Sequence, residues 1–405
     1  MIWAGSGLSG LSDSVRAAEE AASGAMSRSG LRRAGLVFLF ATVDHAPKYA
    51  EMLAAVRRVT GCGNLAGCSG AGVLAAEGEI EGEKGVAVLA IAADKATAAP
   101  FLVHNLKGRD REAGREIGQI VGPYRRGDSL LVLFPDTLNC NPEALFSGIG
   151  EILGSVPVVG GGAADDDAGK ATYQMCGGSV ISNGVSGVLL TGELSSSIGV
   201  TQACRPIGAP MRITATDGNV IQALDGRPAA EMLAVSIGES LSSRIDRLAG
   251  FIFVGFPVED PLPGGRFERG AYLVRNIIGV DTGSGAVAVG KQVTPGEIVS
   301  FVLRDPAGAR DDLKAMLEEE SAVRATAAPR FGLYFNCCAR GSSLYGMDGI
   351  DTAYIRRAFA DLPVAGFFGF CEIASMRGAA RLHTYTGVMG LVSEVVLPTG
   401  KEPVQ

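Results

Sequence analysis

Apolar runs of seven to nine residues alternate with amphipathic stretches along most of the chain. The run at 35–42, GLVFLFAT, is uninterrupted, as expected for a strand that is covered on both faces. The stretch at 12–28 has apolar residues at helical spacing, and the stretch at 46–60 repeats that spacing. These patterns predict a helix, a buried strand and a second helix, in that order.

The same order of elements occurs three times. Each copy reads helix, apolar strand, helix, glycine-rich segment and closing strand. In the second copy the helices are predicted at 110–122 and from Asn141 and Pro142 onward, around a strand at 129–136. In the third copy the helices are predicted at 311–322 and 351–360, around a strand at 330–338. The closing strands are predicted at 85–92, 184–192 and 384–392.

The glycine-rich segments align when Gly67, Gly160 and Gly366 are placed at equivalent positions, which matches GCSGAGV, GGGAADD and GFFGFCE. None has the GxGxxG spacing of a dinucleotide site or the lysine of a phosphate-binding loop. The repeats predict an α/β, or mixed α+β, fold of layered mixed sheets with helices on the outer faces. Residues 193–310 are a longer strand-rich passage that could contain a degenerate fourth copy. A break near 205–215 predicts two domains, 1–210 and 211–405.

Composition narrows the functional classes. The chain has 405 residues, a formal net charge of −7 and 47% hydrophobic residues, which is typical of a globular protein with a large interior. No lysine and arginine block is present, so we expect no nucleic-acid partner. The longest apolar run, about nine residues, is too short to span a bilayer. Because the N-terminus has no basic segment before an apolar core, we expect a cytoplasmic protein.

Cysteine and histidine usage does not indicate a cofactor. The eight cysteines show no CxxC spacing, and the three histidines are far apart, so we expect neither a disulfide framework nor a zinc site. The triple aspartate at 165–167 could suggest Mg²⁺ or Ca²⁺, but adjacent aspartates rarely all point inward. We therefore expect no metal and no cofactor, and interpret the segment as a loop that covers a pocket.

The segment NCCARG at 336–341 has several interpretations. In one, Cys337 and Arg340 line a pocket at the end of a strand, and Arg340 binds a carboxylate. In another, the cysteines are core residues and Arg340 pairs with a structural carboxylate. In a third, Cys337 is a nucleophile, although a nucleophilic cysteine usually needs a base and His383 is the only histidine that could reach it.

Other segments offer similar alternatives. Glu372 could pair with Arg340, hold the opposite end of a bound amino acid, or be a solvated carboxylate. The glycines at 160–162 offer backbone N–H groups for an anion, beside Asp165. Cys68 and Ser69 lie among small residues, either at a site or where backbones pack closely. Arg205 could contact a ligand or anchor two domains.

Several of these motifs, in this order, resemble the FIST family: NLAGCSGAGVLAAEGEIE, VPVVGGGAADD, CRPIGAP, GNVIQALDGRPAAEML, FNCCARGSSLYG, LPVAGFFGFCEI and HTYTGVMGLV. The resemblance covers about residues 30–392 and implies tandem FIST domains, an N-terminal one at 1–210 with two repeats and a C-terminal one at 211–405. Two positions depart from the family pattern: Cys371 replaces the second glycine of GFFGxGEI, and Cys338 is an addition.

The resemblance implies a sensory protein of signal transduction that binds a small molecule, with an amino acid or similar carboxylate as the suggested ligand and a signalling protein as a further partner. We expect binding rather than catalysis. An enzyme that uses Cys337 and a protein–protein adaptor are the alternatives. The candidate ligand-binding residues are Cys68, Ser69, Gly160, Gly161, Gly162, Asp165, Cys337, Arg340, Gly341 and Glu372.

Overall fold

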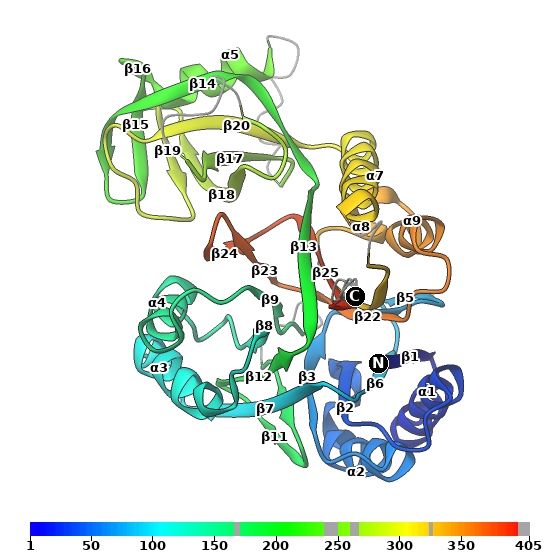
Figure 1. The fold of residues 1–405 in the computed structure, drawn as a ribbon. Helices are drawn as coiled ribbons and strands as arrows, with labels where there is room; N and C mark the ends of the chain where they lie inside the picture. Colours follow the sequence, from blue (N-terminus) through cyan, green and yellow to red (C-terminus); the bar gives the residue numbers. More distant parts are fainter. Residues whose placement is uncertain (166–170, 239–249, 260–266, 324–326, 396–405) are drawn as a thin grey trace, which may run out of the picture. The chain divides into compact units, whose positions relative to one another are not determined.

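The structure is a computed structural model that describes residues 1–165, 171–238, 250–259, 267–323 and 327–395 (Figure 1). The chain forms two compact units. The first comprises Met1–Val200, Ala315–Leu382 and the chain from Gly387 onward, and the second comprises Thr201–Lys314 and His383–Thr386. The units are thus discontinuous in sequence, whereas the predicted domains are divided by a single boundary at residue 210.

Three six-stranded sheets make up the first unit, and each follows the same plan. In order across the first sheet lie β1 (Ile2–Ser9), β6 (Val86–Ala93), β2 (Leu36–Thr42), β3 (Leu65–Gly70), β10 (Gln174–Cys176) and β11 (Ser179–Ile181). In the second lie β7 (Ala96–His104), β12 (Gly184–Gly192), β8 (Asp128–Pro135), β9 (Val158–Gly162), β23 (Cys371–Met376) and β24 (Ala379–His383). In the third lie β13 (Leu194–Gln202), β25 (Thr386–Glu394), β21 (Pro329–Cys337), β22 (Val364–Gly369), β4 (Gly72–Ala75) and β5 (Gly78–Glu81).

The sheets are mixed, as predicted. The central pairs β2–β3, β8–β9 and β21–β22 are parallel, and β6, β12 and β25 run antiparallel to β2, β8 and β21. The three predicted repeats and their closing strands are confirmed. The outer strands β1, β7 and β13 were not predicted, because their short side chains give no clear periodicity.

A hairpin from each repeat crosses to a different sheet. The hairpin β4–β5 follows β3 in sequence but pairs with β22 of the third sheet. The hairpin β10–β11 follows β9 and pairs with β3, and β23, which follows β22, pairs with β9. The three repeats therefore interlock in a cycle, and no sheet is complete without a segment from another repeat.

Helices cover the outer faces of the sheets, as predicted. They are α1 (Ser14–Ser29), α2 (Tyr49–Thr60), α3 (Asp110–Val121), α4 (Pro142–Leu153), α7 (Pro306–Val323) and α9 (Ile350–Ala358). Asp13 and Asn141 cap α1 and α4 by accepting hydrogen bonds from the backbone N–H groups of Arg16 and Ala144. Buried apolar side chains of α1 and α2 pack on the first sheet, and those of α3 and α4 on the second.

The inner faces of all three sheets share one apolar core. Three phenylalanines at equivalent positions of the repeats, Phe40, Phe134 and Phe335, form a triangle with ring centroids 5.3, 5.7 and 6.2 Å apart. Phe367 packs against all three, at 5.1–5.9 Å. The three repeated phenylalanines lie within two residues of the carboxyl ends of their strands, so this aromatic cluster fills the core close to those ends.

The second unit contains a barrel of antiparallel strands. Its order is β14 (Cys204–Asp217), β20 (Ile298–Arg304), β17 (Ile252–Pro257), β18 (Tyr272–Asp281), β19 (Ala286–Val289), β15 (Val220–Leu224) and β16 (Arg227–Pro228), and a pairing of β14 with β15 closes it. The helix α5 (Ala229–Ile237) packs on this core. Most of residues 193–310, considered as a possible fourth copy, form this barrel. Its described strand pairs are all antiparallel, whereas each repeat has a parallel central pair, so the hypothesis of a fourth copy is wrong.

Candidate ligand site at the carboxyl ends of the strands

The parallel strands of the three repeats end in equivalent places. The pairs end at Thr42 and Gly70, at Pro135 and Gly162, and at Cys337 and Gly369. Ligands of α/β proteins commonly bind beyond the carboxyl ends of such strands, where the loops begin. Nearly all the predicted site residues lie at this end of the first unit.

Buried polar atoms without a hydrogen-bond partner occur near this end of the first and third sheets. Within the described part of the first unit they include His45 Nε2, Gln174 Oε1, Arg340 Nη1 and both amide atoms of Asn336. All four side chains are 0% exposed. Leaving a buried polar group unpaired costs about 1–3 kcal/mol, so such groups are rare and usually have a function or a bound water or ligand.

His45 and Gln174 each use one polar side-chain atom in a hydrogen bond, while their other polar atom, Nε2 of His45 and Oε1 of Gln174, has no partner. His45 lies in the 3₁₀ helix η1 (Val43–Lys48), and its Nδ1 contacts Ser14 Oγ at 2.8 Å. Burial lowers the pKa of this imidazole, which favours the neutral ring. The Gln174 Nε2 donates to Thr172 Oγ1 at 3.1 Å, while its carbonyl oxygen accepts nothing.

Gln174 and Glu372 occupy equivalent places in two sheets. Gln174 of β10 is the register partner of Cys68, and Glu372 of β23 is the register partner of Gly161. Register partners in antiparallel strands face the same side of the sheet. Cys68 faces the common core, and a Cβ added to Gly161 would lie 2.9 Å from Phe367 in that core. Both side chains therefore face inward, at the level of the aromatic cluster, because Cys68 is also the register partner of Phe40 and Gly161 lies against Phe367.

Ser69 of the first repeat forms hydrogen bonds with two residues of the second repeat. Its hydroxyl donates to the carbonyl oxygen of Ala164 at 2.8 Å and accepts from the Tyr173 N–H at 3.0 Å. Burial raises the pKa of the neighbouring Cys68 thiol well above its ordinary value. Both residues are thus buried at this end of the sheets, as the site hypothesis requires, but their contacts also suit the alternative of close packing.

The glycines of the second motif are strand residues. Gly160, Gly161 and Gly162 end β9, and Gly161 and Gly162 pair in register with Glu372 and Cys371. Asp165 follows and is 1% exposed. The other two residues of the triple aspartate lie outside the described residues.

Cys337 is the last residue of β21 and is 3% exposed. Its register partner is Gly369, from which the chain turns toward Cys371. Burial, and then the charge of Glu372, raise the pKa of the Cys371 thiol. Cys371, which replaces a glycine of the family pattern, is therefore a neutral, buried thiol.

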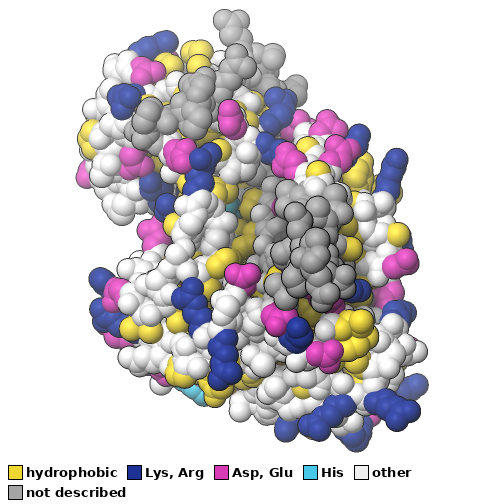
Figure 2. All heavy atoms as spheres, viewed as in Figure 1, with side chains coloured by type: hydrophobic (Ala, Val, Ile, Leu, Met, Phe, Trp, Pro, Cys, Tyr) yellow, Lys and Arg dark blue, Asp and Glu magenta, His cyan; other side chains and the backbone are white. Residues whose placement is uncertain are grey.

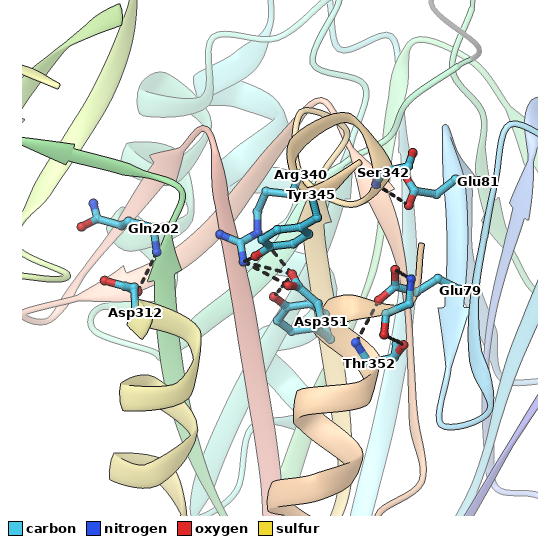
Figure 3. A network of polar contacts seen from close by, with 11 residues as sticks. Glu79, Glu81, Gln202, Asp312, Arg340, Ser342, Tyr345, Asp351 and Thr352 are labelled. Atoms are coloured by element: carbon cyan, nitrogen blue, oxygen red, sulfur yellow. Dashed lines mark hydrogen bonds and ion pairs between the residues drawn. The ribbon is translucent and has the colours of Figure 1, made fainter. Parts of the chain in front are cut away.

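Arg340 forms a buried ion pair (Figure 3). Its Nε and Nη2 donate to the Asp351 carboxylate at 3.0–3.2 Å, and Nη2 also donates to the Tyr345 hydroxyl at 2.9 Å. The Tyr334 hydroxyl donates to the same carboxylate at 2.8 Å. Burial works to lower the pKa of Arg340, but the charge of Asp351 outweighs it, and the pKa lies well above its usual value. Asp351 is therefore the structural carboxylate, and the suggested pair with Glu372 is not formed.

Two glutamates of the β4–β5 hairpin accept hydrogen bonds from the segment that follows NCCARG (Figure 3). Glu81 accepts from the Ser342 N–H at 3.0 Å, and Glu79 accepts from the N–H groups of Gly349 and Thr352 at 2.9 Å, which caps α9. Gly341 has a φ of 58°, and a Cβ there would lie 2.3 Å from the Glu81 carboxylate. The positive φ and the nearby Glu81 carboxylate therefore explain why position 341 of the motif is a glycine, without reference to a ligand.

Sequence reasoning missed His45, Gln174 and Asn336 as site residues. A signal existed for Asn336, because it is a polar residue in the otherwise apolar run FGLYFNCC. It missed Asp351, which lies on α9 of the same repeat and contacts Arg340 through packing of α9 on the sheet. It missed Glu79 and Glu81 because they come from β5 of another repeat and reach Ser342, Gly349 and Thr352 through a chain crossing that no local pattern reveals.

No group of three or more metal-ligating side chains occurs among the described residues. None of the helices in the described ranges is long and apolar enough to cross a membrane. Over the face shown in Figure 2, Lys and Arg side chains are interspersed with Asp and Glu and form no continuous stripe.

Comparison with known proteins decides the family. The sequence profile of the FIST N domain matches residues 35–227, and that of the FIST C domain matches residues 229–375. The chain belongs to the FIST family. FIST domains are generally sensory domains of signal transduction that bind small ligands.

Relatives of this FIST protein include uncharacterized proteins of mycobacteria. One from Mycobacterium tuberculosis is 31% identical over 392 residues, which are 96% of this chain and 98% of the relative. One from Mycobacterium bovis is 30% identical over 385 residues, 94% of this chain and 96% of the relative. A cyanuric acid hydrolase from A. caulinodans aligns over 98% of this chain and 100% of its own, with 10% identity and a TM-score of 0.34, which is too low to support an argument.

Proposed function

We propose that this FIST protein is a cytoplasmic sensor whose small polar ligand, an amino acid or similar small carboxylate, binds at the carboxyl ends of the parallel strands. The observation that carries the proposal is the set of buried polar atoms without partners at this end: His45 Nε2, Gln174 Oε1, Arg340 Nη1 and the Asn336 amide. A ligand that bonded to them would remove a cost that the free protein bears.

The chemistry of these groups suits a molecule with both donors and acceptors. Gln174 Oε1 is an acceptor, and the inward-facing Glu372 is a carboxylate, so both suit an ammonium group. The free Nη1 of Arg340 and the amide N–H of Asn336 suit a carboxylate. The charge of Arg340 is already balanced by Asp351, so Arg340 would act as a hydrogen-bond donor more than as an unpaired cation.

A thermal-shift screen of the twenty amino acids and of small carboxylates tests the proposal. A ligand that binds only the folded state stabilises it by RT ln(1 + L/Kd), where L is the free ligand concentration, so the melting temperature rises with the logarithm of this concentration once it exceeds Kd. The proposal predicts at least one stabilising compound. No shift from any of them at millimolar concentration would contradict it.

The variant Gln174→Leu makes the test specific. Leucine removes the unpaired carbonyl, so the ligand-free variant should be as stable as the wild type or more stable, while the ligand-induced shift is lost. Gln222→Leu, at an exposed position of β15, is the matched control and should keep the shift. A ligand shift that persists unchanged in folded Gln174→Leu would remove Gln174 from the site.

A further inference from the structure

The amino ends of the parallel strands surround a second feature of the first unit. Three equivalent residues of the closing strands, Ile91, Leu190 and Val392, pair in register with Leu36, Leu130 and Phe331. All six belong to the shared apolar core. Because the three pairs are equivalent in the three repeats, they lie around the common axis of the three sheets. They lie on the opposite side of the aromatic cluster from the candidate ligand site.

Five of these six residues, all except Leu130, line a cavity of about 290 Å³. All three sheets contribute to its wall, and five of its fourteen lining positions are small: Gly35, Ala92, Ala93, Ala96 and Ala98. Exposed residues of its lining, among them Asn64 and Thr97, mark its mouth. Small-molecule pockets have volumes of about 300–1,000 Å³, so this cavity is close to the lower end of that range.

The wall of the cavity defines what can occupy it. Among the described residues that line it none is charged, and Asn64 and Thr97 are the polar ones. The Asn64 amide already donates to the Gly35 carbonyl oxygen at 3.1 Å. An apolar cavity of about 150 Å³ is enough to hold benzene, so this one has room for about two fused rings or a chain of similar volume. An ion would lose its hydration here without gaining a partner.

We infer that this axial cavity is a second binding site, distinct from that of the proposed function, and that it takes a neutral apolar molecule the size of two fused rings. Its ligand is held by contact with aliphatic walls and by the exclusion of water, rather than by hydrogen bonds. Because the cavity lies at the amino ends of the parallel strands and the candidate ligand site at their carboxyl ends, the polar ligand and the apolar ligand can bind at the same time.

The test uses indole as the neutral probe and indole-3-acetate as its charged counterpart, with melting temperature and calorimetry as readouts on the full chain. Indole should raise the melting temperature with increasing concentration, and indole-3-acetate should bind at least tenfold more weakly. Ala98→Leu places three additional carbons in the cavity and should weaken indole binding at least tenfold. Ala96→Leu is the second variant, should the first not fold. Ala54→Leu, on the exposed face of α2, is the control and should bind as the wild type does.

Absence of an indole effect at millimolar concentration would overturn the inference, as would equal binding by folded Ala98→Leu or Ala96→Leu and by the wild type. Tighter binding of indole-3-acetate than of indole would overturn it as well. The variant Gln174→Leu should bind indole normally, so failure of the polar site and failure of this cavity are distinguishable.

Discussion

A Cβ atom added to Gly366 would lie 1.6 Å from the carbonyl oxygen of Tyr334, its register partner on the adjacent parallel strand. The same relationship recurs at Gly67, 1.7 Å from the Leu39 carbonyl, and at Gly160, 2.0 Å from that of Leu133. No side-chain movement can relieve contact with a backbone oxygen. The glycines that align the three repeats are therefore required by close backbone approach, independently of any ligand.

Gly366→Ala should lower the free energy of unfolding by about 3 kcal/mol or more, or prevent folding, because the strands must separate to admit the methyl group. Gly150→Ala is the matched control. Gly150 lies inside α4 and an added Cβ would meet no atom within 4 Å, so alanine should stabilise by about 0.5–1 kcal/mol. Urea unfolding measures both, and similar effects in the two variants would contradict the argument.

Asp351→Ala should cost about 3–5 kcal/mol in unfolding free energy, because it leaves the Arg340 guanidinium buried without its counter-charge. The double variant Arg340→Met, Asp351→Leu removes both charges and should recover part of that loss. Asp361→Ala, at an exposed position, controls for the loss of a carboxylate. A single variant as stable as the wild type would show that Arg340 does not depend on Asp351.

Glu81 should make stability depend on pH. Its pKa in the folded protein is raised to about 7, chiefly by burial, against an ordinary value of 4.5. Between these values the folded state retains a proton that the unfolded state has lost, so this contribution is complete below pH 4.5 and is lost as the pH rises through 7. In Glu81→Gln the free energy of unfolding should fall less over this range, whereas exposed Glu83→Gln should follow the wild type. Identical pH profiles for the wild type and Glu81→Gln would exclude this role.

Cysteine labelling tests the alternative of a catalytic thiol. Cys68, Cys337 and Cys371 are buried, while Cys338 is partly exposed. Iodoacetamide at neutral pH should therefore modify Cys338 well before the other three, which should react only on unfolding. Peptide mass spectrometry, with Cys338→Ser to separate the adjacent pair, gives the rates. Rapid modification of Cys337 in the folded protein would favour the enzyme.

Periodicity was sufficient to predict the repeats. The helix predicted at 110–122 is α3 (Asp110–Val121), and the closing strand predicted at 184–192 is β12. These elements are long and have one strong pattern, so local reasoning works. No element was predicted just before the closing strand at 85–92, where the structure has β5, whose alternating Glu79 and Glu81 bind backbone N–H groups of another repeat.

The placement of the candidate segments in the fold was predictable, but their contacts were not. The glycine motifs and NCCARG lie at one end of the strands, as the repeats implied. The role of Arg340 depends on Asp351, which lies on α9, and on hydroxyl groups of Tyr334 and Tyr345. Because such partners are chosen by packing between elements, the sequence left a structural ion pair and a ligand-binding arginine equally open.

A crystal structure grown with the amino acid that gives the largest thermal shift is the most direct test of the central claim. The proposal predicts ligand density at the carboxyl ends of the parallel strands, within hydrogen-bond distance of Gln174 Oε1, of the Asn336 amide or of Arg340 Nη1. Density elsewhere, with these atoms still lacking a partner, would contradict it.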